Sequence, residues 1–449
     1  MFSTFSQRMI ARRLVRVVTC GMVMGSAVGL AGCHGLLDVS DPTLIQSQTI
    51  ANSAGAMGWR VNALQTLSLQ MAPTAYESAL LSDERSFDPG TLPNPPYANP
   101  YLNYDKRDAT YMALIQAASY SDRHLGQLDL IVSTTTQAIN AMRANGSPTV
   151  KDEYLGELFA VRGYAILQMA EEICSGFPIN DVAADRTVVL SGPYTTDSAT
   201  KYALMQTDSA LAHGHDSTQF VSLASVVRGR ALMDLGYYAE ASAAVANVPT
   251  SFTYMTDPSV IGNIFAWNTN GCCEPVGERE GGNGLPFVSA NDPRVPTYFS
   301  QMGVFNPSDS LFDQSKYPDN NTPIVLASGI EARLIQAEAA LNASNPSAMV
   351  DTLNALRATI GLGTLSVPST QQGQVDLLYS ERAFWLYLTA RRVGDLRRLI
   401  KNYGRDPESV FPTGPYRNGG SFGNATSFPF TVAVQGQFNP KITTGCAVP

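Results

Sequence analysis

Pairs of amphipathic helices joined by short turns constrain the fold of this chain more than any other feature. Two segments, at about 150–249 and 326–402, carry apolar and small residues at helical spacing. In the first, one predicted helical face is formed by Tyr154, Leu158, Val161, Ala165 and Met169. In the second, a pair turns at Asn345-Pro346 and stops at Gly361. Because each pair leaves an apolar face for its neighbour, the sequence predicts a mainly α-helical scaffold.

The small residues relate these pairs to tetratricopeptide repeats. The small, large, turn-glycine, tyrosine and small positions of such a repeat are occupied by Gly229, Leu232, Gly236, Tyr238 and Ala241. Insertions of unequal length separate the pairs, so we expect an irregular tetratricopeptide-type scaffold rather than a regular solenoid. Further helices are predicted at about 50–79 and 108–145.

The stretch 379–398 combines helical periodicity with a high density of charge. Its spacing predicts an amphipathic helix whose charged residues, such as Glu381 and Arg382, form ion pairs and contact solvent. Gly394 is the candidate for a break between two helical pieces, because glycine is a poor helix former.

The carboxylates of Asp83 and Glu84 are expected to cap a helix or lie at the surface, since neighbours on a helix point apart and cannot flank one glycosidic bond.

Three loop-rich segments, at about 88–104, 250–325 and 403–449, are the candidate ligand and partner regions. Rings stack on sugar faces, while amides and guanidinium groups bind hydroxyls. The candidate ligand-binding residues are therefore Tyr97, Tyr101 and Tyr104 in the first segment, and Trp267, Asn268, Asn270 and Arg294 in the second. Packing is the alternative for both groups: the tyrosines in an ordinary surface loop, and Trp267 in the core beside a disulfide.

The N-terminus has the layout of an export signal. Basic residues between Arg8 and Arg16 precede an apolar run from Val17 to Leu30. The run ends in Leu30-Ala31-Gly32-Cys33, which resembles a bacterial lipobox. That resemblance implies removal of residues 1–32 and lipidation of Cys33, which would anchor the chain at a membrane surface. An ordinary signal with a chance cysteine is the alternative.

Four further cysteines, Cys174, Cys272, Cys273 and Cys446, are candidates for disulfides in an exported protein. Adjacent cysteines rarely bond each other, so we expect Cys272 and Cys273 to reach Cys174 and Cys446 in some order. No Cys-x-x-Cys pair suggests zinc and no ligand spacing suggests calcium, so no metal and no cofactor is predicted.

The composition and the missing motifs favour a binding protein over two other classes. A net charge of −8 argues against a nucleic-acid partner, because phosphate contacts need clustered Lys and Arg. The chain has no His-Glu-x-x-His motif and no convincing glycine-rich phosphate loop. No catalytic residue is therefore assigned, although a hydrolase assembled from distant residues stays an alternative.

Several motifs together resemble the SusD/RagB family. They are Glu381-Arg382, Trp385-Leu386, Arg392 and Asp395-Leu396-Arg397-Arg398 near the C-terminus, Leu37-Asp38-Val39 with Pro42 after the lipobox, Asp292-Pro293-Arg294, and Phe428-Pro429-Phe430 with Asn439-Pro440 in the tail. The chain departs from the family pattern at Thr389-Ala390, where Glu-Gly is usual.

The resemblance implies a single SusD-like domain over residues 33–449. It also implies a lipoprotein of a Gram-negative outer membrane that captures an oligosaccharide or another nutrient. The partner would be a TonB-dependent barrel transporter of the SusC type. The alternative is a tetratricopeptide-type scaffold that binds only proteins.

Overall fold

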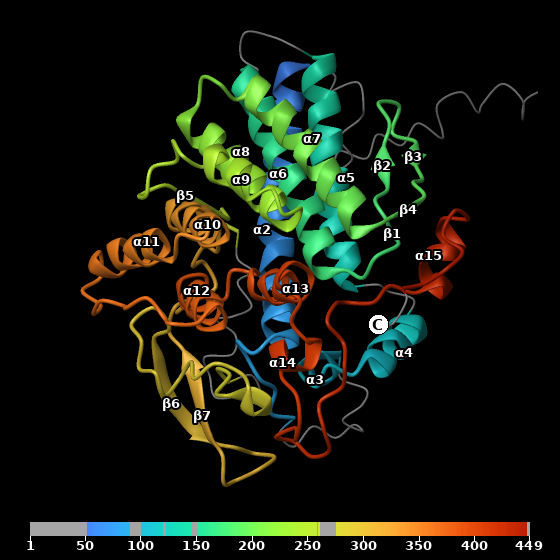
Figure 1. Cartoon of the computed structure of the whole chain (residues 1–449). Coiled ribbons are helices and arrows are strands. Elements are labelled where there is room, and N and C mark those ends of the chain that lie inside the picture. The colour runs from blue at the N-terminus through green and yellow to red at the C-terminus, as the bar shows by residue number, and fades with distance from the viewer. Residues whose placement is uncertain are drawn as a thin grey trace, which may run out of the picture. The chain divides into compact units, whose positions relative to one another are not determined.

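A computed structural model describes residues 52–89, 100–119, 123–145, 151–257, 259–260 and 275–446. The chain divides into two units, residues 1–50 and 51–449, and all described residues belong to the second. This second unit is mainly helical, as predicted (Figure 1). Within the described ranges, no helix combines the length and the apolarity needed to cross a membrane.

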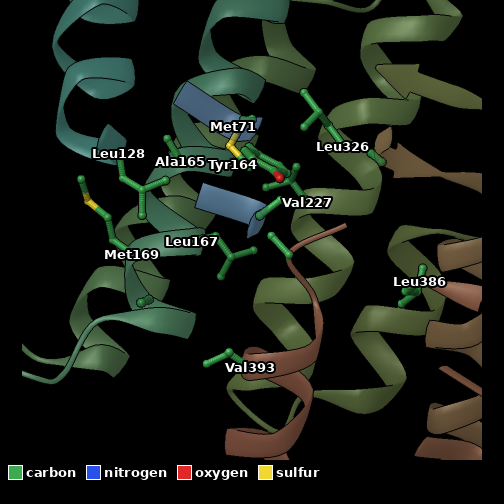
Figure 2. Packing of buried hydrophobic residues seen from close by; sticks show 14 of the residues in the cluster. Met71, Leu128, Tyr164, Ala165, Leu167, Met169, Val227, Leu326, Leu386 and Val393 are labelled. Atoms are coloured by element: carbon green, nitrogen blue, oxygen red, sulfur yellow. The ribbon is translucent and has the colours of Figure 1, made fainter. Parts of the chain in front are cut away.

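Helix α6 (Asp152–Glu172) lies at the centre of the N-terminal helices and is buried along most of its length. It packs against α5 (Arg123–Ala144), α7 (Thr196–His213) and α8 (Thr218–Asp234), while α2 (Ser53–Leu81) packs against α5. Figure 2 shows Met71 of α2, Tyr164 and Leu167 of α6 and Val227 of α8 in the same part of the core. A Cβ on Gly156 would lie 2.4 Å from the backbone of Gly214, so glycine is needed where α6 meets the end of α7.

The predicted helical pairs are confirmed. Helix α8 pairs with α9 (Tyr238–Ala244), and Gly236 makes the turn between them with a φ of +80°. A Cβ on Gly229 would come within 2.6 Å of Val245, which explains the small residue of the repeat pattern. Helix α10 (Gly329–Asn342) pairs with α11 (Pro346–Ala358), whose N-terminus is capped by the Asn345 side chain.

The predicted loop-rich segments contain short elements that the sequence did not reveal. The short helices are α3 (Pro100–Asp105), the 3₁₀ turn η3 (Glu280–Gly282), α14 (Pro407–Val410) and α15 (Val432–Phe438). The helix predicted at about 108–145 is observed as α4 (Ala109–Ser119) and α5. Strand β6 (Thr297–Met302) pairs with β7 (Ser310–Gln314), and β5 (Thr253–Met255) pairs with β8 (Val325–Ser328). Two smaller antiparallel pairs precede α7: β1 (Phe177–Pro178) with β4 (Pro193–Tyr194), and β2 (Asp181–Val182) with β3 (Val188–Val189).

The predicted helix at 379–398 is two helices, but the break is not at Gly394. Helix α12 (Gln371–Trp385) ends before a turn in which Leu388 and Ala390 have φ values of +54° and +59°. Helix α13 (Arg392–Tyr403) then contains Gly394. A Cβ on Gly394 would meet the Glu171 side chain at 3.2 Å, so this glycine lets α13 lie against α6.

Most charged residues of the stretch 379–398 are buried, which corrects the prediction that they contact solvent. Asp395 accepts hydrogen bonds from Arg382 (2.7 and 2.8 Å) and from Arg398 (2.7 Å). Arg398 also donates to the buried Glu338 of α10. Burial alone would raise the pKa of Asp395, but the Arg382 and Arg398 guanidinium groups hold it below its usual range. The expected ion pairing is therefore confirmed, in the interior rather than at the surface.

We call these pairs the buried ion-pair network; they are made by Arg382, Arg391, Arg392 and Arg398. The network connects α12 and α13 to α10 and to the residues just after α2. Arg391 donates to Glu331 of α10 at 3.1 Å. Arg392 donates to both carboxylate oxygens of Asp83, at 2.6 and 2.9 Å. The prediction that Asp83 and Glu84 cap a helix or lie at the surface is wrong, because both are buried just after α2. Burial raises the pKa of Glu84 to about 8, and its carboxyl group accepts from the Leu388 N–H of the α12–α13 turn.

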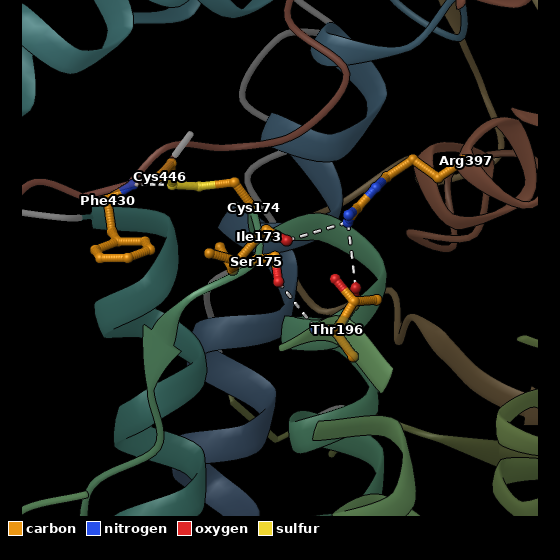
Figure 3. Close-up of a disulfide and its surroundings, with 8 residues drawn as sticks. Ile173, Cys174, Ser175, Thr196, Arg397, Phe430 and Cys446 are labelled. Atoms are coloured by element: carbon orange, nitrogen blue, oxygen red, sulfur yellow. Dashed lines mark hydrogen bonds between the residues drawn. A yellow bond between two sulfur atoms is a disulfide. The ribbon is translucent and has the colours of Figure 1, made fainter. Parts of the chain in front are cut away.

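The C-terminal tail returns to the end of α6, and this determines the disulfide (Figure 3). Phe428 exchanges backbone hydrogen bonds with Glu172 and Cys174, and its ring stacks on that of the buried His124. The return places the Cα atoms of Cys174 and Cys446 5.6 Å apart, and these two cysteines bond each other. The predicted pairing of both with Cys272 and Cys273 is therefore wrong. The two partners are separated by 272 positions, a closeness that no local pattern reveals.

We expect Asp395→Asn to lower the free energy of unfolding by ~3–5 kcal/mol, because it leaves the buried Arg382 and Arg398 without their shared carboxylate. The matched control is Asp376→Asn, which breaks the surface pair with Arg405 and should cost less than ~1 kcal/mol. Urea unfolding followed by circular dichroism measures both. Equal small losses would show that the network does not stabilise the fold.

Non-reducing digestion and mass spectrometry should recover a linked peptide pair that contains Cys174 and Cys446. Replacing both by serine should lower the free energy of unfolding by ~2–5 kcal/mol, because the bond closes a long loop. A peptide that links either cysteine to Cys272 or Cys273 would contradict the observed pairing.

Candidate functional site

The three predicted loop-rich segments meet around one pocket, of about 200 Å³. We call it the loop pocket; it is lined by Pro89, Leu102, Asn103, Lys106, Asp108, Tyr111, Phe305, Tyr416, Asn418 and Gly419. The first segment, the residues that follow it and the start of α4 supply the lining from Pro89 to Tyr111. The turn between β6 and β7 supplies Phe305, and the tail supplies Tyr416, Asn418 and Gly419. This convergence makes the loop pocket the candidate functional site.

Two buried carboxylates fix the first segment to the other two. Asp88 accepts hydrogen bonds from the backbone N–H groups of Val304 (2.9 Å) and Phe305 (3.1 Å). Asp105 accepts from the N–H of Phe87 (2.8 Å) and from the hydroxyl of Tyr416 (2.7 Å). Burial and the nearby Glu280 carboxylate hold the pKa of Asp105 well above its usual range. These bonds fix the backbone at Phe305 and the hydroxyl of Tyr416, two residues that line the pocket.

Two arginines hold the tail in place. Arg417 contacts Ser86, Glu280 and Asp309, which belong to the first and second segments. Arg107 follows α3 with a φ of +57° and is fully buried. Its guanidinium donates to the carbonyl of Ala425 (2.9 Å), to the carbonyl of Pro412 and to Glu408.

The lining of the loop pocket offers rings, amides and one charge of each sign. Tyr111 and Phe305 are 38% and 46% exposed, so their rings are accessible at the pocket. Asn418 is oriented by hydrogen bonds from its amide nitrogen to the Phe87 carbonyl (2.6 Å) and to the Tyr416 hydroxyl (3.0 Å). Lys106 and Asp108 add a donor and an acceptor. Exposed rings beside oriented polar groups suit a hydroxylated ligand with apolar faces.

Several exposed apolar residues lie on β6 and in the turn that follows it. We call them the hairpin strip; they are Tyr298, Phe299, Met302, Val304 and Phe305, all between 40% and 55% exposed. The strip shares Phe305 with the loop pocket. Exposed apolar residues gathered on one hairpin make it a candidate for a protein contact.

The structure places three predicted ligand-binding residues in contacts within the protein. Tyr104 is 2% exposed and packs edge-on against Phe428. Tyr101 packs against Tyr76 and accepts a hydrogen bond from Arg123 at 2.9 Å. Both tyrosines therefore pack within the protein, which was the alternative to ligand binding. The guanidinium of Arg294 is buried between Asp292 and Glu381, with distances of 2.7 and 2.6 Å, so Arg294 stabilises the fold instead of facing a ligand.

The other predicted residues lie outside the described residues. These are Tyr97, Trp267, Asn268, Asn270, the lipidation candidate Cys33, and Cys272 and Cys273. Sequence reasoning missed Tyr111, Phe305 and Asn418. Tyr111 lies at the start of a helix that looks like ordinary scaffold, and Phe305 and Asn418 carry no motif. The Asn418-Gly419-Gly420 turn was the one available signal, because adjacent glycines mark a tight turn that presents its neighbours.

Comparison with known proteins gives relatives by structure but not by sequence. No protein-family model matches the chain, and no curated protein sequence matches it. Surface glycan-binding protein A from Bacteroides thetaiotaomicron has a TM-score of 0.63 at 10% identity, over 88% of this chain and 99% of that one. A SusD superfamily protein from Bacteroides vulgatus has a TM-score of 0.58 at 13% identity, over 86% and 99% of the two chains.

A laminarin-binding SusD-like protein has a TM-score of 0.60 at 11% identity and is matched over 89% of this chain and the whole of that one. Each likeness covers most of both chains. The chain therefore has the SusD-like fold, as the sequence motifs indicated.

Proposed function

We propose that this chain is a surface glycan-binding protein that captures an oligosaccharide at the loop pocket and passes it to an outer-membrane transporter. The observation that carries the proposal is the convergence of three loop-rich segments on one pocket with two accessible rings, Tyr111 and Phe305. Neighbours with the same fold include a surface glycan-binding protein and a laminarin-binding protein, which supports a glycan as the ligand class.

The lining of the loop pocket supports binding rather than catalysis. Hydrolysis of a glycosidic bond generally needs two carboxyl groups that flank the bond. Among the described residues that line the loop pocket, Asp108 is the only one with a carboxyl group. The polar groups around it are amides, a hydroxyl and an amine, which suit hydrogen bonding to sugar hydroxyls.

The proposed partner is a TonB-dependent barrel of the SusC type, and the proposed anchor is a lipid on Cys33. The hairpin strip supports a protein partner, because it is apolar and exposed and shares Phe305 with the pocket. A partner that covered the strip would contact the same surface from which a bound glycan would be released. Lipidation at Cys33 would hold the protein at the outer membrane beside such a partner.

Affinity electrophoresis against laminarin, starch, xylan and homogalacturonan tests the binding proposal. We expect retardation by at least one glycan. Phe305→Ala and Tyr111→Ala should each weaken that binding about fivefold to tenfold, because a stacked ring contributes about 1 kcal/mol. Tyr237→Ala is the matched control: Tyr237 is 48% exposed but lies in the α8–α9 turn, so its removal should leave retardation unchanged. If Phe305→Ala and Tyr111→Ala are both retarded as strongly as the unaltered protein, the glycan binds outside the loop pocket. Hydrolysis of a glycan would contradict a purely binding role.

Purification of the native protein in mild detergent tests the partner. We expect a large barrel protein to co-purify, and Phe299→Glu to reduce its recovery because a charge would then enter the apolar hairpin strip. Met205→Glu on α7 is the control, since Met205 is also exposed (61%) but lies away from the strip. Recovery of the protein without a barrel would favour the alternative of a stand-alone tetratricopeptide-type scaffold.

A further inference from the structure

A second and larger pocket, of about 350 Å³, lies among helix ends and has no part in the loop pocket. We call it the helix-end pocket. It is lined by Ala170 and Glu171 of α6, Thr196 and Asp197 of α7, Asp234 of α8, Gly394, Arg397, Arg398, Ile400 and Lys401 of α13, and Thr426 of the tail. No aromatic residue is among them, so this pocket cannot stack a sugar ring. Its volume is at the low end for small-molecule sites, which is roughly 300–1,000 Å³.

Most charges at the helix-end pocket are already paired. Glu171 binds Arg230, Asp234 binds Arg398 at 3.0 Å, and Lys401 binds Asp197 at 2.6 Å. These pairs account for all three carboxylates that line the pocket. One lining cation, Arg397, is left over.

Arg397 differs from the other arginines of α12 and α13. Arg382, Arg391, Arg392 and Arg398 each bind a carboxylate. Arg397 has no carboxylate within ion-pair distance among the described residues, and its Nη1 donates instead to the backbone carbonyls of Ala170 (3.2 Å), Glu171 (2.7 Å) and Ile173 (3.1 Å). Burial lowers the pKa of Arg397, and the Asp234, Glu172 and Glu171 carboxylates, none of them in direct contact with it, offset this only in part.

The three carbonyls orient the guanidinium. They belong to the last turn of α6 and to the residue that precedes Cys174, so the disulfide supports the same segment (Figure 3). With Nη1 held there, the Nε–Nη2 edge of the fork donates no hydrogen bond within the described part of the chain. Neither atom is sealed in the interior. That edge is the geometry by which arginine binds both oxygens of a carboxylate.

Neutral hydroxyl groups complete the lining. The side chains of Thr196 and Thr426 donate no hydrogen bond to another described residue, and both line the pocket. Thr196 is the first residue of α7, an 18-residue helix whose N-terminus favours negative charge nearby. An oxyanion beside Arg397 and hydroxyl groups within reach of the two threonines would therefore match this lining.

We propose that the helix-end pocket binds a small hydroxylated carboxylate, such as a uronic acid or a hydroxy acid, through the Nε–Nη2 edge of Arg397. This site is separate from the loop pocket and uses charge where the loop pocket uses rings. It gives the protein a way to sense or carry an acidic molecule at the same time as a neutral glycan.

Isothermal titration with D-glucuronate, with D-glucose and with sodium sulfate tests this site. We expect glucuronate to bind at least tenfold more tightly than either of the others, because glucose lacks the carboxylate and sulfate lacks the hydroxyls. Arg397→Lys keeps the charge but removes the fork, and should weaken glucuronate binding at least tenfold. Arg405→Gln is the control, since Arg405 lies just past α13 and pairs with the surface residue Asp376; glucuronate affinity should not change.

Arginine footprinting with phenylglyoxal gives a readout on the unaltered protein, in case Arg397→Lys fails to fold. Glucuronate should slow modification of Arg397 severalfold while glucose does not, with modified peptides quantified by mass spectrometry. Glucuronate that binds but leaves Arg397 unprotected occupies another site and overturns the proposal. Absence of glucuronate binding at millimolar concentration, or equal binding of sulfate, also overturns it.

Discussion

The fold depends on a set of arginine–carboxylate pairs that are buried together where α13 crosses the other helices. Each charge there is removed from water, and an unpaired charge in such a place is strongly destabilising. The network is therefore stable only if α10, α12 and α13 all take their places at once. Asp395 illustrates this, because one carboxylate serves Arg382 of α12 and Arg398 of its own helix. Such mutual dependence favours one arrangement of helices over near alternatives.

The same network reaches the loop-rich half and thereby positions the loop pocket. Arg392 binds Asp83 just after α2, and Asp83 also accepts a hydrogen bond from the N–H of Leu285 in the second segment. Arg294 of that segment binds Glu381 of α12. The loops that carry Asp88 and Phe305 therefore start from anchored points. A site built from long loops needs such anchors, because loops without a packed core of their own would otherwise be mobile.

The sequence predicted the helical pairs because helical periodicity and turn residues are local signals. It did not predict which charges are buried, since an amphipathic pattern looks the same whether its polar face meets water or a second polar face. Gly394 was misinterpreted for a related reason: low helix propensity is visible in the sequence, whereas close approach to Glu171 is not. The departure at Thr389-Ala390 is informative in the structure, because Ala390 has a φ of +59°, a conformation that glycine adopts without strain.

The candidate site was predictable as a set of segments but not as a set of residues. The segments are recognisable by their lack of periodicity and their Gly and Pro content, and the structure brings all three together. Which aromatic rings face outward depends on contacts between distant parts of the chain. Tyr101 and Tyr104 are drawn inward by Tyr76 and Phe428, whereas Tyr111 and Phe305 are left at the surface. The disulfide also depends on contacts between distant parts of the chain, because the backbone pairing of Phe428 with the end of α6 brings the tail close to Cys174.

Arg397 is the one arginine of α12 and α13 that does not join the buried ion-pair network among the described residues. Every other arginine of α12 and α13 pairs with a carboxylate. Arg398 takes one from its own helix, Asp395, whereas Arg397 contacts backbone carbonyls instead. The protein instead holds this guanidinium with three carbonyl oxygens, which satisfy hydrogen bonds without neutralising the charge. A guanidinium that is partly removed from water and has no carboxylate in direct contact suits a ligand that brings an oxyanion to it, and Arg397 holds this state beside a pocket. The scaffold half would then take part in binding, alongside the loop half, rather than serve only as its support.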